Sequence, residues 1–284
     1  MGNQVAMSWE MRSNIRRGKP LTWKGLKFYP IRMEHYEEFL DVRNALAIRM
    51  TSLSNISFEY LSMPFLTAMW AIDYDTLVAT GSSIGFFERI IRFLYLSLRL
   101  KYKKEEALRT IYTDPTDRRI LDRVVVTQDG NTVEITPDDF DIDIRPLLAA
   151  QNGIDLPDES ENPDLVRAEE DLAAKGASEL KVDTDTMIAS VAYQSHLKEK
   201  DLDKWTVLEF ERRRQAIERG KRFDMFGQAE LSGMVKFGKG NPFPSWCFDR
   251  NENGSAALIS FGEMRGKLAG LGDLNKIVNG EKSN

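Results

Sequence analysis

The sequence predicts an α+β protein, and three observations carry this prediction. Of its 284 residues, 42% are hydrophobic and 10% are aromatic, which is enough to build a core. Two stretches place β-branched or alternating residues around tight turns, and several longer segments repeat apolar residues at helical spacing. We expect a module of helices with short β-hairpins over residues 1–153, an acidic linker with prolines over 154–183, and a mainly helical module over 184–284 that ends in a small hairpin.

Two hairpins are predicted in the first module. Residues 21–30, LTWKGLKFYP, alternate apolar and polar side chains around Lys24-Gly25. Residues 124–135, VVVTQDGNTVEI, place two β-branched runs on either side of Asp129-Gly130-Asn131, which is the chemistry of a tight hairpin turn.

Three helices are predicted between these hairpins. Residues 58–77 are one helix, in which Pro64 marks an early first turn or a kink. Residues 84–112 are another, which begins with the apolar run IGFFERIIRFLYLSLRL. The segment 31–50 places these residues near one helical face: Met33, Tyr36, Leu40, Arg43 and Ala47.

A helix after the second hairpin carries clear start and stop signals. Thr136 can cap its N-terminus, Pro137 suits its first position, and the acidic residues that follow favour the positive end of the helix dipole. Pro146 interrupts this helix and Gly153 ends it.

The middle of the chain is strongly acidic. Residues 138–185 hold 15 acidic and 4 basic side chains. Within them, residues 154–176 contain two prolines and form the best linker candidate. In the second module, Thr206 and Glu209 form a capping-box pattern at the start of a long charged helix, and Trp205 is placed to staple its first turn.

Composition excludes several classes of function. The run at 84–100 contains four charged residues, so it predicts a buried amphipathic helix and no membrane span. No secretory signal is expected, because no apolar run follows a basic N-terminal region. One cysteine, Cys247, and two histidines argue against a disulfide framework and a Cys/His zinc site. No basic stripe indicates nucleic-acid binding.

Two near matches to functional motifs lie close to the C-terminus. Gly233 to Lys239 reads G-x-x-x-x-G-K, like a phosphate-binding loop, but Gly240 replaces the metal-binding Ser or Thr and two prolines follow. Asp249 to Gly254 reads D-x-N-x-N-G, like a calcium loop, but its twelfth position is Ser260 instead of Glu. A turn between strands SWCFD and AALISF explains these residues better, so we expect neither a cofactor nor a metal.

Other acidic clusters favour structural interpretations. Asp139, Asp141 and Asp143 form D-x-D-x-D without the glycine of a calcium loop, which indicates a helix N-terminus. His35 and Glu38 could pair on a helix, but a solvated face is favoured. Asp73 and Asp75 could be paired catalytic carboxylates, although capping of neighbouring helices is the simpler interpretation.

Three stretches together resemble a known family. They are LTWKGLKFYPIRMEHYEEFLDVRNALAIRMTSL with the following YLSMPFLTAMWAID, then ITPDDFDIDIRPLLAAQNGIDLPDESENPDLVRAEED, and finally WTVLEFERRR through LSGMVKFGKGNPFPSWCFD. The stretches, over roughly residues 20 to 250, are similar to the tail assembly chaperones of long-tailed phages and prophages of Gram-positive bacteria. No residue here matches a functional site of that family.

The resemblance implies a non-enzymatic protein of the host bacterial cytoplasm. Such chaperones bind the tape-measure protein, keep it soluble, help to recruit major tail-tube subunits, and are absent from the mature virion. Many occur as a short form and a frameshifted long form. Two modules joined by an acidic linker would suit a long form, but a single gene product would look the same.

An aromatic cluster is the predicted partner-binding site. It lies in a stretch rich in Gly and Pro and consists of Phe237, Phe243, Trp246 and Phe248. The alternative is that these side chains cover the small core of their own module. Self-association, a structural role as a tail-completion or connector protein retained in the virion, and an enzyme that uses His35 or Asp73 and Asp75 are the other interpretations left open.

Overall fold

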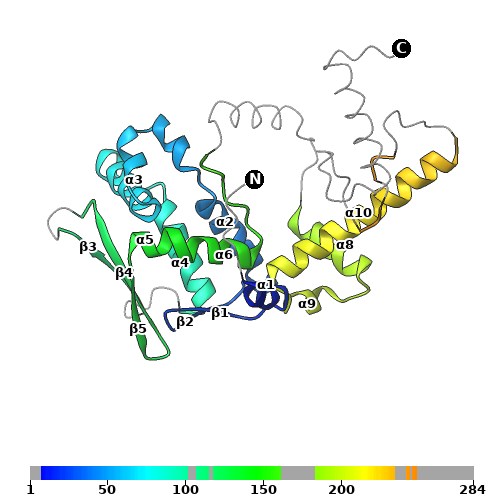
Figure 1. The fold of residues 1–284 in the computed structure, drawn as a ribbon, viewed down its shortest axis with the longest axis horizontal. Helices are drawn as coiled ribbons and strands as arrows, with labels where there is room; N and C mark the ends of the chain where they lie inside the picture. Colours follow the sequence, from blue (N-terminus) through cyan, green and yellow to red (C-terminus); the bar gives the residue numbers. More distant parts are fainter. Residues whose placement is uncertain are drawn as a thin grey trace, which may run out of the picture. The chain divides into compact units, whose positions relative to one another are not determined.

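The computed structural model describes residues 8–101, 107–114, 118–160, 183–233, 241–243 and 245–247, as helices and two antiparallel sheets (Figure 1). The predicted α+β class is confirmed. Internal contacts divide the chain into two compact units, Met1–Ile217 and Glu218–Asn284, and the boundary falls within helix α10.

Helices and short strands alternate along the chain. In order they are α1 (Trp9–Arg16), β1 (Leu21–Trp23), β2 (Leu26–Phe28), η1 (Met33–His35), α2 (Tyr36–Leu46), η2 (Met50–Asn55), η3 (Phe58–Ser62), α3 (Phe65–Thr80), α4 (Phe86–Leu98), β3 (Leu108–Tyr112), β4 (Leu121–Gln128), β5 (Asn131–Ile135), α5 (Pro137–Asp139), the π-helical η4 (Phe140–Ile144), α6 (Arg145–Asn152), α8 (Thr184–Gln194), α9 (Glu199–Leu202) and α10 (Val207–Leu231).

Both predicted hairpins of the first module are confirmed. Lys24 and Gly25 take φ values of 43° and 88° between β1 and β2, and Asp129 and Gly130 take 52° and 81° between β4 and β5. Positive φ at both central residues matches the twist of a two-residue hairpin. A Cβ on Gly25 would lie 2.6 Å from Nδ2 of Asn131, so a larger residue there would have to displace this exposed side chain as well as adopt a φ of 88°.

The predicted helix over 84–112 is wrong beyond residue 98. Helix α4 ends at Leu98 because Arg99 takes a left-handed conformation with a φ of 54°. Leu108–Tyr112 is instead strand β3, which pairs antiparallel with β4 and completes a three-stranded sheet in the order β3-β4-β5.

The predicted helices around Pro64 and at 31–50 are partly right. Pro64 ends one element and begins another, so the chain forms η3 and then α3 in place of one continuous helix. Tyr36 of the predicted set is buried on α2, but Arg43 is exposed, and Phe39 and Val42 complete the buried face in its place.

The signals around residue 136 act as predicted at both ends of the helical segment. Thr136 and Asp139 form a reciprocal capping box, with Pro137 in the first turn, and Gly153 ends α6 with a φ of 70°. The chain stays helical through Pro146, but the turn just before it, Phe140–Ile144, is π-helical. A π turn suits this place because proline lacks the N–H that a regular α-helix needs.

Residues 183–217, beyond the predicted linker, contact the first module directly. They belong to the same compact unit as the first module. Val207 donates its N–H to the carbonyl of Ile31 at 2.9 Å, and Met33 donates to the carbonyl of Trp205 at 2.9 Å. Phe210 is fully buried in the core that α2 and α4 share. The boundary within α10 therefore lies well beyond the predicted linker.

Three buried amides complete the backbone hydrogen bonds of the first hairpin. Gln128 accepts from the N–H of Lys27 at 2.7 Å and donates to its carbonyl at 3.0 Å. Gln151 donates to the carbonyl of Phe28, and Asn152 accepts from the N–H of Ile31. Since a buried backbone group without a partner is costly, these side chains fix β2 against β4 and α6.

Among the described residues, no helix combines the length and the apolar character that crossing a membrane would require. The predicted capping box of α10 is confirmed, because Thr206 accepts from the N–H of Glu209 and Glu209 accepts from the N–H of Thr206. Residues 245–247 take no strand conformation, and the rest of the predicted C-terminal hairpin lies outside the described residues.

Candidate partner-binding surface

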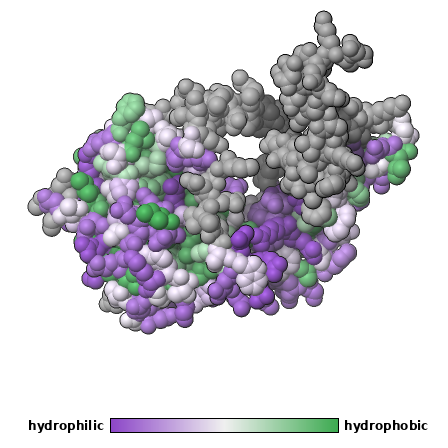
Figure 2. Space-filling model, in the orientation of Figure 1, coloured by the Kyte–Doolittle hydropathy of each residue, from purple (hydrophilic) through white to green (hydrophobic). Residues whose placement is uncertain are grey.

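Large apolar side chains remain exposed on η3, just before it at Ile56, and on the last turns of α3. Phe58 is 78% exposed and Val78 is 70% exposed. Figure 2 shows hydrophobic side chains over this end of the first unit. We call the set the η3–α3 surface, and it consists of Ile56, Phe58, Leu61, Leu77 and Val78.

The local sequence explains why these side chains stay outside. Pro64 forces Met63 into an extended conformation, with a φ of −93° and a ψ of 148°. Helix α3 then starts with Phe65 and Leu66, which are buried. The residues before Pro64 therefore do not continue the buried face of α3, and the side chain of Phe58 stays exposed to solvent.

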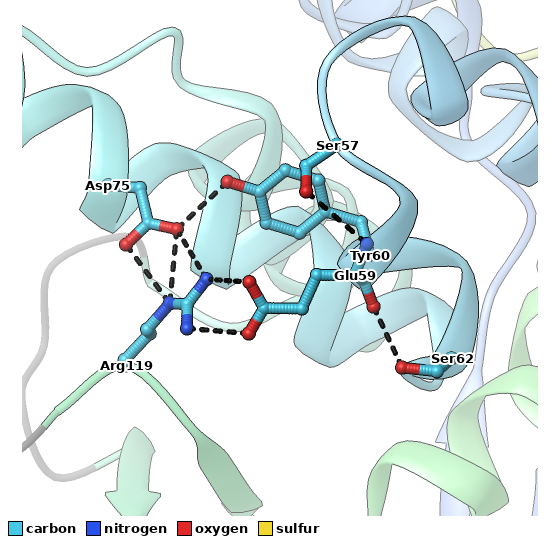
Figure 3. Close-up of polar contacts among 6 residues, drawn as sticks. All are labelled: Ser57, Glu59, Tyr60, Ser62, Asp75 and Arg119. Atoms are coloured by element: carbon cyan, nitrogen blue, oxygen red, sulfur yellow. Dashed lines mark hydrogen bonds and ion pairs between the residues drawn. The ribbon is translucent and has the colours of Figure 1, made fainter.

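An ionic network holds η3 against α3 (Figure 3). Arg119 donates to both carboxylate oxygens of Glu59, at 2.7 and 2.8 Å, and its Nε donates to Asp75 at 3.1 Å. The hydroxyl of Tyr60 donates to Asp75 at 2.8 Å. Bidentate pairs between arginine and carboxylate are geometrically specific, so this network fixes the position of η3.

The charges of this region are already satisfied. The chain has no Lys or Arg between Arg49 and Arg89. Hydrogen bonds from Arg119 lower the pKa of Glu59, which keeps that carboxylate ionised. Burial, followed by the hydrogen bond to Asp75, raises the pKa of Tyr60, which keeps its hydroxyl protonated as a donor. The η3–α3 surface therefore offers apolar side chains on a fixed support, an arrangement suited to an apolar partner.

The predicted aromatic cluster is only partly described. Phe243 is half-buried and its ring lies 5.0 Å from that of Phe226 between centroids. The guanidinium of Arg222 lies 5.4 Å from the Phe243 ring, so Phe243 packs within its own unit. Trp246 is 67% exposed and accessible to a partner. Phe237 and Phe248 lie outside the described residues.

The predicted carboxylate candidates occupy structural positions. Asp73 is buried and accepts from the backbone N–H groups of Gly85, Phe86 and Phe87, so it caps α4 as the capping interpretation expected. Asp75 belongs to the Arg119 network. His35 and Glu38 lie 3.9 Å apart with both side chains about half exposed, which fits a solvated helix face.

The D-x-D-x-D stretch is distributed over separate contacts. Asp139 pairs with Lys24 at 2.8 Å, Asp143 accepts from the indole of Trp23, and Asp141 accepts from the N–H of Phe65 at 2.6 Å. Burial raises the pKa of Asp141 to about 6. Within the part of the chain that the structure describes, no group of three or more His, Cys, Asp or Glu side chains could hold a metal ion.

The C-terminal motifs fall mostly outside the described residues. Residues 234–240 and 248–284 contain the phosphate-loop and calcium-loop patterns, apart from Gly233. Cys247 is half-buried, and its sulfur lies 3.6 Å from Oγ of Ser245. The interpretation of these motifs therefore stays a prediction.

Comparison with known proteins adds no relative: no family model, no curated protein and no solved structure matches this chain.

Sequence reasoning missed the η3–α3 surface. It assigned 58–77 to a single helix, which would have aligned Phe58 with the buried face. Two signals point to the surface, namely the proline at 64 and the long run without a basic residue around it. Arg119 carries no local signal, because its partners Glu59 and Asp75 are distant in sequence.

Proposed function

We propose that this protein is a tail assembly chaperone of a long-tailed phage or prophage, which binds the tape-measure protein and keeps it soluble in the host cytoplasm. It would also help to recruit major tail-tube subunits and would be absent from the finished virion. The exposed apolar side chains of the η3–α3 surface are the observation that carries this proposal.

The chemistry of this surface suits a long helical client. A tape-measure helix must hide its apolar stripe until the tail tube encloses it, and an apolar face on a second protein can cover such a stripe. The Arg119 network holds Phe58 and Leu61 in place before binding, which lowers the ordering cost of association. The resemblance of the three sequence stretches to tail assembly chaperones supports the same function.

Co-expression with the tape-measure protein of the same genome tests this proposal. We expect affinity capture and size-exclusion chromatography to recover a soluble complex with several copies of this protein on one tape-measure chain. If the tape-measure protein precipitates while this protein stays free, the proposal fails.

A pair of matched variants tests the surface itself. Phe58→Ser removes an aromatic side chain that is 78% exposed, and Trp9→Ser removes one on α1 that is 77% exposed. We expect Phe58→Ser to reduce the captured tape-measure protein by about tenfold, as for a hot-spot residue, and Trp9→Ser to leave it unchanged. Equal effects of the two variants would show that the η3–α3 surface is not the contact.

Purified virions distinguish the proposed chaperone from a tail-completion or connector protein. A chaperone is missing from particles, whereas a structural component is present in a fixed number of copies. Quantitative mass spectrometry of purified particles measures this directly, and a fixed copy number would overturn the chaperone proposal.

A further inference from the structure

A second feature of the first unit lies away from the η3–α3 surface. Where the chain leaves β2 and enters η1, it forms a pocket of about 460 Å³ against the C-terminal half of α4. Apolar groups form part of its lining, among them Ile31, Leu96 and Leu100. Three guanidinium groups line it as well, those of Arg32, Arg92 and Arg99. This volume is in the range of pockets that hold a ligand or a few side chains.

Arg99 is held in this pocket at a conformational cost. It follows the last turn of α4 with a φ of 54° and a ψ of 39°, where glycine is the usual residue. Its guanidinium stacks on the ring of Tyr29, 4.1 Å from the centroid. Tyr29 is held in turn, because its N–H donates to the carbonyl of Ser97 at 2.7 Å. A non-glycine residue in this conformation is a reason to look for a function of its side chain.

Glu34, Glu38 and His35 also line the pocket, and each of the two carboxylates has a basic neighbour, Arg32 for Glu34 and His35 for Glu38. Arg92 pairs with Asp41 at 2.8 Å, and Arg32 lies 3.8 Å from Glu34. Among the described residues, Arg99 is the guanidinium of this pocket that has no carboxylate partner. A guanidinium that packs over an aromatic ring can still donate its N–H groups to a carboxylate.

We propose that this pocket binds a segment of a partner protein in which a carboxylate side chain is followed by a large apolar side chain. The carboxylate accepts hydrogen bonds from Arg99, and the apolar side chain packs between Ile31, Leu96 and Leu100. The rim is open, with Arg32 and Glu34 about half exposed, which suits a continuous peptide better than an enclosed small molecule. This site does not depend on the proposed function.

Nuclear magnetic resonance of the full chain, labelled at Ile and Leu methyl groups, tests the site. The probe is the capped peptide Gly-Ser-Glu-Leu-Ser-Gly, compared with versions that carry Gln for Glu or Ser for Leu. We expect the Glu-Leu peptide to shift the methyl signals of Ile31, Leu96 and Leu100, and each altered peptide to bind about tenfold more weakly. Equal shifts with all three peptides would overturn the proposal.

One substitution separates binding from stability. Arg99→Gly removes the guanidinium and also relieves the left-handed backbone, so the thermal midpoint should equal or exceed that of the unmodified protein. The same variant should weaken binding of the Glu-Leu peptide at least tenfold. Arg43→Ala, which removes one exposed arginine from α2, controls for net charge and should bind normally.

Two further outcomes would contradict the proposal. If Arg99→Gly binds the peptide as well as the unmodified protein does, the guanidinium has no role in recognition. If 4-methylpentanoate shifts the same signals and the peptide does not, the pocket takes a small carboxylate and the partner segment is excluded.

Discussion

Asp141 shows how a single carboxylate connects two elements. Its Oδ2 accepts from the first N–H of α3, whereas its Oδ1 is buried and has no hydrogen-bond partner. Arg145 lies close enough to attract it but directs its own donors to the carbonyls of Leu46 and Ile48. Burial outweighs these attractions, so the pKa of Asp141 is raised to about 6.

Asp141 therefore makes stability depend on pH. A raised pKa means that the folded state holds the proton more tightly than the unfolded state, so its stabilising effect is complete below about pH 4 and is lost as pH rises through about 6. Asp141→Asn keeps an acceptor for Phe65 and removes the titration. We expect the free energy of unfolding of the unmodified protein, relative to this variant, to rise by about 2 kcal/mol between pH 7 and pH 4.

Urea unfolding of both proteins at several pH values measures this difference. Acidic groups with a lowered pKa, such as Asp139 and Asp183, titrate in both proteins and cancel. A difference that stays constant across the pH range would show that Asp141 titrates normally.

At the scale of the element, helix α4 depends on a cap that comes from another helix. Asp73 on α3 is buried and accepts the first backbone donors of α4, at 2.8 to 3.1 Å. An isolated α4 would lack this acceptor, because Gly85 precedes it in place of a capping side chain. The two helices therefore form as a pair.

Removal of this cap should be costly. Asp73→Ala leaves the N–H groups of Phe86 and Phe87 without an acceptor, whereas Gly85 keeps Oγ of Ser83 at 3.0 Å, and we expect a loss of about 2 to 3 kcal/mol in the free energy of unfolding. Asp73→Asn retains one acceptor oxygen and should lose about 1 kcal/mol. Chemical denaturation followed by circular dichroism measures both values, and equal stabilities of the two variants would contradict the role of the carboxylate.

Elements with local signals could be predicted from sequence. Turn residues identify both hairpins, and capping residues identify the helices that start at Pro137 and Val207. Strand β3 could not be predicted, because it has no turn of its own and forms only through pairing with β4. The end of α4 was missed for a related reason, since Arg99 takes the conformation expected of glycine.

At the scale of the whole molecule, one core spans most of the described residues of the first unit. Leu202, Val207 and Phe210 are almost completely buried among residues of the first hundred. Acidic composition suggested a linker and hence a boundary near 154. Composition could not show that the chain beyond this segment returns to the first module. The η3–α3 surface could not be predicted for a comparable reason, because its exposure depends on the break in the helical segment at Pro64.

Truncation tests the division of the chain. We expect residues 1–217 to unfold cooperatively, because they contain the whole described core. Residues 1–153 should fail to do so, because they lack Val207 and Phe210, and burial of each large side chain contributes about 2 kcal/mol. Calorimetry of the two fragments distinguishes a boundary within α10 from one at residue 154. A cooperative transition of residues 1–153 alone would favour the boundary at 154.

The hydrogen bond from the N–H of Val207 to the carbonyl of Ile31 also has a consequence for synthesis of the protein on the ribosome. The ribosome must add about 175 residues after Ile31 before its hydrogen-bond partner exists. At about 5 to 20 residues per second, this takes roughly ten seconds or longer. Throughout that interval, the apolar side chains of the first module that the segment around Val207 covers in the folded protein stay exposed to solvent. We therefore expect the nascent chain to be a client of host folding factors before it can act on any other protein.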